Sequence, residues 1–265
     1  MPELPQHLID QLTTSPAQQC KPEAITVADG VFLWVESIAA GHSFLSIHSN
    51  GKATVYTYGR YGDIGQGNPM VGEGVLLRMS DNWASRDYLG EQLYRMQARV
   101  FKVLDADKIL IDGYLSGIYT DSGKTSINPR GTMTRQFGKV IDQYDLTGNN
   151  CTTHSVKAIR FGGSRIFDRN LIGFTYSEDF TIPGSLMRYM QKVSGDVADM
   201  RAIEVTEQMK GWVPNAKGWA PGQESLEEQA MESSAGTAGH AGSSTGYAGG
   251  TFGGSLGGMY EPKNR

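Results

Sequence analysis

The sequence predicts an α+β fold in which an antiparallel sheet packs against a helix that carries a cysteine. Residues 44–58 hold two β-rich runs joined by Ser49-Asn50-Gly51-Lys52, and Asn-Gly between such runs is a strong hairpin signal because both central residues of the turn need a positive φ. Residues 149–153, Asn-Asn-Cys-Thr-Thr, precede apolar residues at helical spacing, Val156 and Ile159. This pattern predicts a helix with Cys151 in its first turn.

Two segments come before the hairpin. Residues 1–24 form a polar lead, with one short helix expected over residues 6–12. Residues 31–35, Val-Phe-Leu-Trp-Val, predict a buried strand because the run is short, continuous and apolar. The hairpin then follows after Ala39-Ala40-Gly41.

His42 begins the first strand of the hairpin. Pairing of the two residues that flank the turn places His42 opposite Gly59. Thr57 is then its nearest diagonal neighbour on the same face of the sheet. A glycine opposite an imidazole leaves room for another group to approach.

Residues 62–140 carry loop, helix and strand signals in turn. The glycine-rich stretch 62–74 is expected to be a flexible loop, and no Gly-Lys-Ser/Thr ends it as a phosphate loop would require. The elements expected after it are a helix over residues 85–96 with Ser85 as its N-cap, a strand over 98–104 and a helix over 132–144.

Two further helix signals follow. Gly162-Gly163 predict the end of the cysteine helix. Residues 182–190 predict another helix, since Pro183 suits the first helical position and apolar residues recur every three to four positions.

The predicted organisation is a polar lead over residues 1–24, one domain over 25–210, and a linker with a flexible tail over 211–265. The tail is rich in Gly, Ala, Ser and Thr, so it buries too little apolar surface to offset the entropy of ordering. A recruitment segment is the alternative for the tail. Within the domain, residues 62–140 form an insert that either borders the cleft or serves as structural filler.

Composition excludes several classes of protein. The formal charge of −4 and the pI of about 5.8 argue against general nucleic-acid binding. Two cysteines, Cys20 and Cys151, cannot form a disulfide framework. We expect no cofactor and no metal, because no Cys/His cluster has zinc-ligand spacing. We also expect no transmembrane segment and no export signal at the start, and therefore synthesis in the cytoplasm.

Cys151 is the main candidate for a chemical role. The positive end of a helix favours the thiolate and lowers the pKa of a cysteine placed there. A buried and inert cysteine is the alternative, because free cysteines are among the most buried residues. His42 shifts the balance toward chemistry, since a strand can present its imidazole to the thiol.

The other histidines are weaker candidates. His154 lies three residues after Cys151 on the same helix, so its ring would have to reach past its own backbone. His48 is on the same strand as His42 but near the turn, and we expect it to be solvated. His7 and His240 fall outside the predicted domain.

Several of these residues resemble one family. Residues 41–47, Gly-His-Ser-Phe-Leu-Ser-Ile, residues 56–59, Tyr-Thr-Tyr-Gly, and Tyr144-Asp145-Leu146 before Asn-Asn-Cys-Thr-Thr are similar to circularly permuted papain-like, NlpC-type cysteine hydrolases. In that branch the histidine strand precedes the cysteine helix, as it does here. The resemblance covers residues 25–60 and 140–190, and it extends more distantly to lecithin:retinol acyltransferase-like proteins.

The resemblance implies roles for individual residues. Cys151 corresponds to the nucleophile and His42 to the general base and later acid. The residue that orients the imidazole sits on the next strand in the family, and this sequence offers Thr57 or Thr54 there. Asp63, just beyond the hairpin, is a further candidate. A hydroxyl orienter stabilises an imidazolium less than a carboxylate does.

The resemblance also implies a function. Many bacterial members are peptidoglycan endopeptidases or amidases, including type VI secretion effectors, so we expect an antibacterial toxin that cuts an amide bond in the target-cell periplasm. The implied partners are peptidoglycan, an immunity protein and a carrier in the secretion apparatus. The alternatives are a lipid-directed acyltransferase or phospholipase with the same Cys/His pair, and an inactive binding or adaptor domain.

Overall fold

The computed structural model describes residues 29–36, 41–61, 71–121, 123–126, 131–171, 174–177, 180, 182–196 and 199–222. Four expectations lie outside the described residues. They are the polar lead with its short helix and Cys20, the candidate Asp63, most of the 62–74 loop, and the tail from residue 223 onward.

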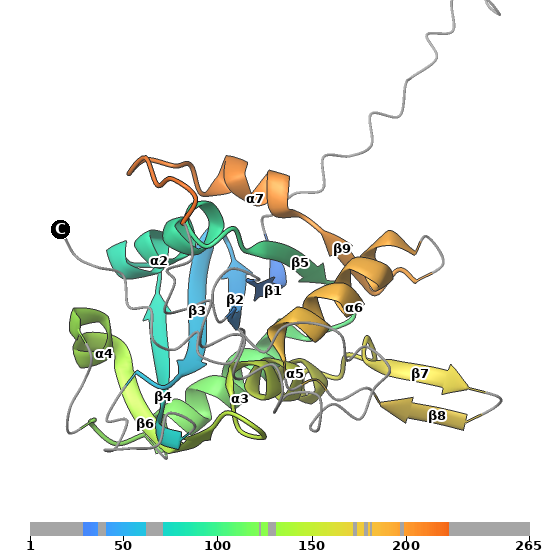
Figure 1. Cartoon of the computed structure of the whole chain (residues 1–265), viewed down its shortest axis with the longest axis horizontal. Coiled ribbons are helices and arrows are strands. Elements are labelled where there is room, and N and C mark those ends of the chain that lie inside the picture. Colours follow the sequence, from blue (N-terminus) through green and yellow to red (C-terminus); the bar gives the residue numbers. More distant parts are fainter. Residues whose placement is uncertain are drawn as a thin grey trace, which may run out of the picture.

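The fold is a mixed α+β architecture built on an open antiparallel sheet (Figure 1). Its strand order is β6-β4-β3-β2-β1-β5-β9, and every neighbouring pair is antiparallel. The strands are β1 (Gly30–Val35), β2 (Ser43–Ser49), β3 (Lys52–Gly59), β4 (Val71–Ser80), β5 (Arg99–Val103), β6 (Gly138–Asp145) and β9 (Ala202–Glu204). A separate ribbon pairs β7 (Asp168–Leu171) with β8 (Phe174–Ser177). The predicted α+β class with an antiparallel sheet is therefore confirmed.

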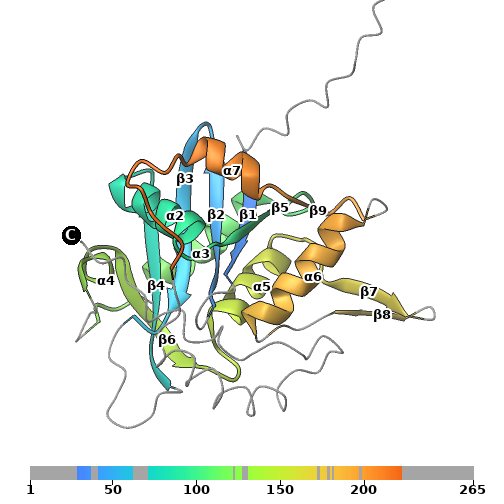
Figure 2. The ribbon, with the colours of Figure 1, turned by 45° about the horizontal axis from the view of Figure 1, so that its top comes forward.

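Helices cover both faces of this sheet (Figure 2). They are α2 (Trp83–Tyr94), α3 (Lys108–Asp121), α4 (Gly131–Phe137), α5 (Cys151–Phe161), α6 (Pro183–Gly195) and α7 (Thr206–Trp212). Alternate residues of β1 divide between two cores: Leu33 joins a cluster with α3, α5 and α6, whereas Trp34 joins one with α2, α4 and α7. Side chains alternate along a strand, so a strand with two buried faces is apolar throughout. This explains the continuous run at residues 31–35.

The hairpin formed by β2 and β3 has the predicted turn. Asn50 and Gly51 both have positive φ values, 54° and 74°, as a two-residue type I′ turn requires. Ser49 pairs with Lys52, and the register continues to Leu45 opposite Tyr56. The same register sets Thr57 on the face that His42 shares.

The cysteine helix begins where the sequence predicts. Asn150 is the N-cap of α5, and its side chain accepts hydrogen bonds from the backbone N–H groups of Thr152 and Thr153. The Thr153 hydroxyl lies 2.9 Å from the backbone nitrogen of Asn150 and completes a capping box. The helix ends at Phe161, followed by Gly163 with a φ of 80°. The helix predicted near residues 182–190 is also present as α6, with Pro183 in its first turn.

Three expectations about residues 62–144 are wrong. Residues 71–74 belong to β4 rather than to a loop. Asn82, not Ser85, caps α2; Ser85 is instead the partner of Asn82 in a capping box. The helix expected over residues 132–144 stops at Phe137, and β6 follows along the edge of β4. The strand predicted at 98–104 is confirmed as β5.

Candidate functional site

The first turn of α5 lies against the start of β2. The Cys151 side chain is buried, with 1% of its surface exposed, and the backbone amide of Ser43 hydrogen bonds to its thiol. One turn further along α5, Ser155 accepts a hydrogen bond from the Ser43 hydroxyl at 3.4 Å. The thiol is therefore held next to the residue that directly follows His42.

Burial governs the ionisation of this thiol. Desolvation raises the pKa of Cys151 to about 11, although hydrogen bonds from Ser43 and Thr152 act in the opposite direction. The expected lowering of the thiol pKa by the start of the helix is therefore wrong for this structure. Removal of the thiolate from water costs more than these hydrogen bonds return.

His42 is equally buried, with 1% of its surface exposed. Its Nε2 atom lies 2.6 Å from the Thr57 hydroxyl, and its ring stacks on Phe44 with 5.8 Å between centroids. Among the described residues, its Nδ1 atom has no hydrogen-bond partner. Desolvation lowers the pKa of His42 to about 3, so the resting imidazole is neutral and carries a single proton.

Thr57 is the centre of a buried hydroxyl cluster. Its oxygen accepts a hydrogen bond from Tyr88 at 3.0 Å and lies 3.0 Å from the Tyr61 hydroxyl. The structure thus brings Thr57 to His42. Thr54, the other orienter candidate, lies near the turn and hydrogen bonds to Ser80.

Glu36 is the residue of this site that the sequence analysis missed. Its backbone N–H donates to the carbonyl of His42 at 2.8 Å, so the β1–β2 ladder continues past Val35 and sets Glu36 opposite His42. Opposite residues of an antiparallel pair share one face. The Glu36 side chain is 2% exposed, and its Oε1 atom has no hydrogen-bond partner within the described part of the chain. The sequence does contain a signal for Glu36, because a carboxylate directly follows the apolar run at residues 31–35.

Burial also controls the Glu36 carboxyl. Desolvation and the nearby Glu91 carboxylate raise the pKa of Glu36 well above its usual range. In turn, the charge of Glu36 raises the pKa values of Cys151 and Tyr61. The Glu36 carboxyl is therefore within electrostatic range of the thiol.

His154 belongs to a different network on the α5 face of the sheet. Its ring stacks on Tyr58 with centroids 3.7 Å apart, and its Nε2 atom lies 3.1 Å from Oδ1 of Asn149 and 3.4 Å from Oδ2 of Asp142. Tyr58 donates a 2.5 Å hydrogen bond to Asp142. Although burial raises the pKa of Asp142, the bonds from His154, Tyr58 and Asn149 hold it below its ordinary value.

His48 corrects another expectation. It is fully buried instead of solvated, with its ring 4.4 Å from those of both Phe32 and Trp212 and its Nε2 atom 2.9 Å from the Ser46 hydroxyl. It therefore has a packing role. His7 and His240 lie outside the described residues.

Comparison with family models, curated proteins and solved structures gives no match for this chain. Within the described ranges, no helix is long and apolar enough to cross a membrane. In the same part of the chain, no three His, Cys, Asp or Glu residues gather in a group that could hold a metal ion.

Proposed function

We propose that this protein is a cysteine hydrolase of permuted papain-like fold, with Cys151 as nucleophile and His42 as general base. The observation that carries the proposal is the arrangement around His42. Nε2 is held by Thr57, Nδ1 is buried without a partner in the described structure, and the neighbouring residue Ser43 contacts the thiol. The order of the histidine strand before the cysteine helix supports the permuted topology.

The mechanism that we propose needs one particular tautomer of His42. Nδ1 of His42 must accept the thiol proton, so Nε2 carries the resting proton and donates it to Thr57. Thr57 also accepts from Tyr88, and its own proton then points to Tyr61. In this arrangement the Tyr88 and Thr57 hydroxyl protons both have acceptors, and the ring is held with Nδ1 available.

The pKa values favour general-base catalysis over a preformed ion pair. With the Cys151 pKa at about 11 and the His42 pKa at about 3, the resting groups are a thiol and a neutral imidazole. In the mechanism that we propose, the proton moves from Sγ to Nδ1 as sulfur attacks the amide carbonyl. The thiol must first come within hydrogen-bond reach of Nδ1, which has no partner among the described residues. The backbone N–H of Cys151 at the start of α5 stabilises the oxyanion.

The remaining steps regenerate the thiol. His42 donates its proton to the leaving amine as the C–N bond breaks, which leaves a thioester on Cys151. Water then attacks the thioester while His42 accepts the water proton, and that proton returns to sulfur as the acid departs. The net reaction consumes one water for each amide bond.

Glu36 supplies what Thr57 cannot. The raised pKa of Glu36 keeps this carboxyl protonated at rest, so it compensates an imidazolium only when it releases its proton as His42 becomes charged. We assign ring orientation to Thr57 and this charge compensation to Glu36. Glu36→Gln keeps the shape of the side chain and removes the ionisable proton. It should lower kcat about tenfold with little change in KM; an unchanged kcat would remove Glu36 from the mechanism.

The proposed substrate is peptidoglycan, and the proposed setting is a type VI secreted antibacterial effector that acts in the target-cell periplasm. This part rests on the family resemblance. An immunity protein and a secretion carrier are the corresponding partners.

The decisive experiment is digestion of purified sacculi followed by mass spectrometry of the released muropeptides. Wild type should release new fragments, Cys151→Ala should release none, and His154→Gln is the matched histidine control that should behave as wild type. Absence of new fragments with wild type would overturn the cell-wall substrate. Cys151-dependent release of fatty acid from liposomes would instead support the lipid-directed alternative.

A further inference from the structure

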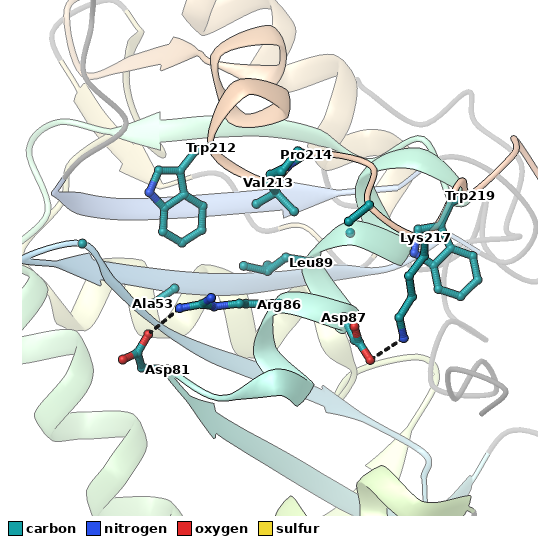
Figure 3. Close-up of a pocket in the computed structure, with 13 residues that line it drawn as sticks. Ala53, Asp81, Arg86, Asp87, Leu89, Trp212, Val213, Pro214, Lys217 and Trp219 are labelled. Atoms are coloured by element: carbon teal, nitrogen blue, oxygen red, sulfur yellow. Dashed lines mark hydrogen bonds and ion pairs between the residues drawn. The ribbon is translucent and has the colours of Figure 1, made fainter. Parts of the chain in front are cut away.

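A pocket lies at the far end of the sheet from Cys151. It has a volume of about 430 Å³ and is bounded by the β2–β3 turn, α2 and the segment after α7 (Figure 3). Gly51 in the turn lines the pocket, whereas His42 lies beyond the other end of β2. At about 3.3 Å per residue, the two sites are roughly 25–30 Å apart along the strand. The volume is within the range of about 300–1,000 Å³ that is typical of small-ligand pockets.

Two indole rings form the walls of this pocket. Trp212 and Trp219 stand at its two ends in Figure 3, with Leu89 and Val213 between them. The Trp212 ring contacts the His48 ring, with 4.4 Å between their centroids. The Trp212 wall is therefore supported by a neighbouring ring.

The Trp219 wall is fixed by its own loop. The backbone N–H of Trp219 donates to the side chain of Asn215 at 2.7 Å, and the Asn215 amide returns a 2.9 Å bond to the Trp219 carbonyl. Gly218 has a φ of 66°, which lets the chain turn tightly between them. The pocket is therefore preformed.

The charged groups of the pocket are balanced. Arg86 lies 3.7 Å from Asp81, and Lys217 donates to Asp87 at 2.6 Å. The two cations and two carboxylates cancel, so neither a phosphate nor an organic cation gains a net attraction. They still offer hydrogen-bond donors and acceptors side by side along one edge.

We infer that this pocket binds a neutral carbohydrate. A pyranose ring presents C–H groups on its faces, which suit the aromatic and apolar lining formed by Trp212, Trp219, Leu89 and Val213. Its hydroxyls lie around the rim, where they suit alternating carboxylates and cations. A lipid chain would make no use of the hydrogen-bonding groups along this edge. The inference goes beyond the proposed hydrolase function, because it does not depend on the chemistry of Cys151.

Binding is tested on the full chain carrying Cys151→Ala, so that turnover cannot interfere. Tri-N-acetylchitotriose and cellotriose are the neutral probes and ATP is the anionic one, each titrated by calorimetry. At least one neutral probe should bind with a Kd of about 1 mM or tighter. Trp219→Ala should weaken that binding about tenfold or more. Trp83→Ala, which removes a half-exposed indole outside the pocket, should leave the Kd unchanged.

Two substitutions at Gly90 distinguish a blocked pocket from a loss of the fold. A Cβ atom at this position would lie 3.7 Å from Nε1 of Trp219 and 3.8 Å from Val213, which is ordinary contact. Gly90→Ala should therefore fold with an unchanged or higher Tm, since alanine favours helix. Gly90→Leu, whose longer side chain fills the pocket, should abolish binding and still melt cooperatively. Failure of both neutral probes to bind wild type, preference for ATP, or equal affinity in Trp219→Ala would each overturn the inference.

Discussion

Two histidines lie near the first turn of α5, and consecutive residues of β3 hold them on opposite faces of the sheet. Thr57 points to His42, and Tyr58 stacks on His154. His42 is fully buried with a hydroxyl partner, whereas the His154 side chain is 11% exposed with the Asp142 carboxylate beside it. A base needs a neutral ring with one nitrogen free to accept a proton, and the surroundings of His42 provide that. Two histidines near the same helix start therefore have different surroundings, which sequence separation alone does not indicate.

The largest expected effect separates the two histidines directly. His42→Gln should lower kcat/KM for amide cleavage by about 10²–10⁴-fold, because the general base is lost. His154→Gln should change it less than about threefold, since that ring serves packing and the Asp142 network. Steady-state kinetics on released muropeptides measures both. Loss of activity in His154→Gln with retention in His42→Gln would reverse the assignment.

The hydroxyl partner of His42 gives the next test. Thr57→Val removes the nearest hydrogen-bond partner of the buried Tyr88 hydroxyl and of Nε2 of His42, which keeps only the Tyr61 hydroxyl at 3.4 Å. An unsatisfied buried polar group costs about 1–3 kcal/mol. We expect a loss of unfolding free energy of that order, together with a lower kcat. Urea denaturation and kinetics give the two values. Thr57→Ser should restore both, and Thr54→Val, an exposed change, should alter stability by less than about 0.5 kcal/mol.

A substitution at Gly74 tests the contacts of Tyr58 and Asp142 beside His154. A Cβ atom there would overlap the Tyr58 hydroxyl and the Asp142 carboxylate. Gly74→Ala should therefore destabilise the fold by about 1–3 kcal/mol while kcat of the folded fraction stays close to that of wild type. Gly148→Ala, where a Cβ would meet nothing within 4 Å, is the matched control for thermal unfolding. Equal stability of the two variants would contradict the close approach.

Acid titration measures the burial of His42 itself. Its pKa is about 3 in the folded protein and near 6.5 unfolded, so between these values the unfolded chain binds the extra proton. The contribution of His42 to the free energy of unfolding is fully present above pH 6.5. It falls as the pH drops toward 3, by on the order of 1 kcal/mol per pH unit.

The titratable groups around His42 are Glu36, Tyr61 and Tyr88, and the Cys151 thiol lies against the next residue, Ser43. Burial raises the pKa of each, so they stay neutral through the lower part of this window. His42→Gln should therefore flatten the acid limb of stability against pH relative to wild type. Parallel acid limbs in the two proteins would show that the imidazole is charged in the fold.

Features with local signals were predictable from sequence. The Asn50-Gly51 turn needs positive φ values, and Asn150 supplies a cap, so the hairpin and the start of α5 follow from neighbouring residues alone. Features that depend on distant partners were not predictable. Residues 138–145 became β6 because β4 offered a strand edge.

The buried polar residues show the same limit. His48 is enclosed by Trp212, which lies far along the chain, and Glu36 is enclosed by α2. The sequence around His48 or Glu36 does not indicate which distant residues will enclose it. Part of the candidate site, the Thr57–His42 contact, could be foreseen from hairpin register, while the carboxyl opposite it could not.

The position of β1 in the middle of the sheet has a consequence for how the chain folds. One edge of β1 pairs with β2, but its other edge must wait for β5, where Val31 meets Val103 about seventy residues later. Long-range pairing of this kind slows folding, because loop closure must precede any gain from contacts. Until β5 is made, an apolar strand with an open edge is exposed to other chains. The interval between synthesis of the hairpin and arrival of β5 is therefore when this protein is most prone to aggregate, and when a chaperone would help it most.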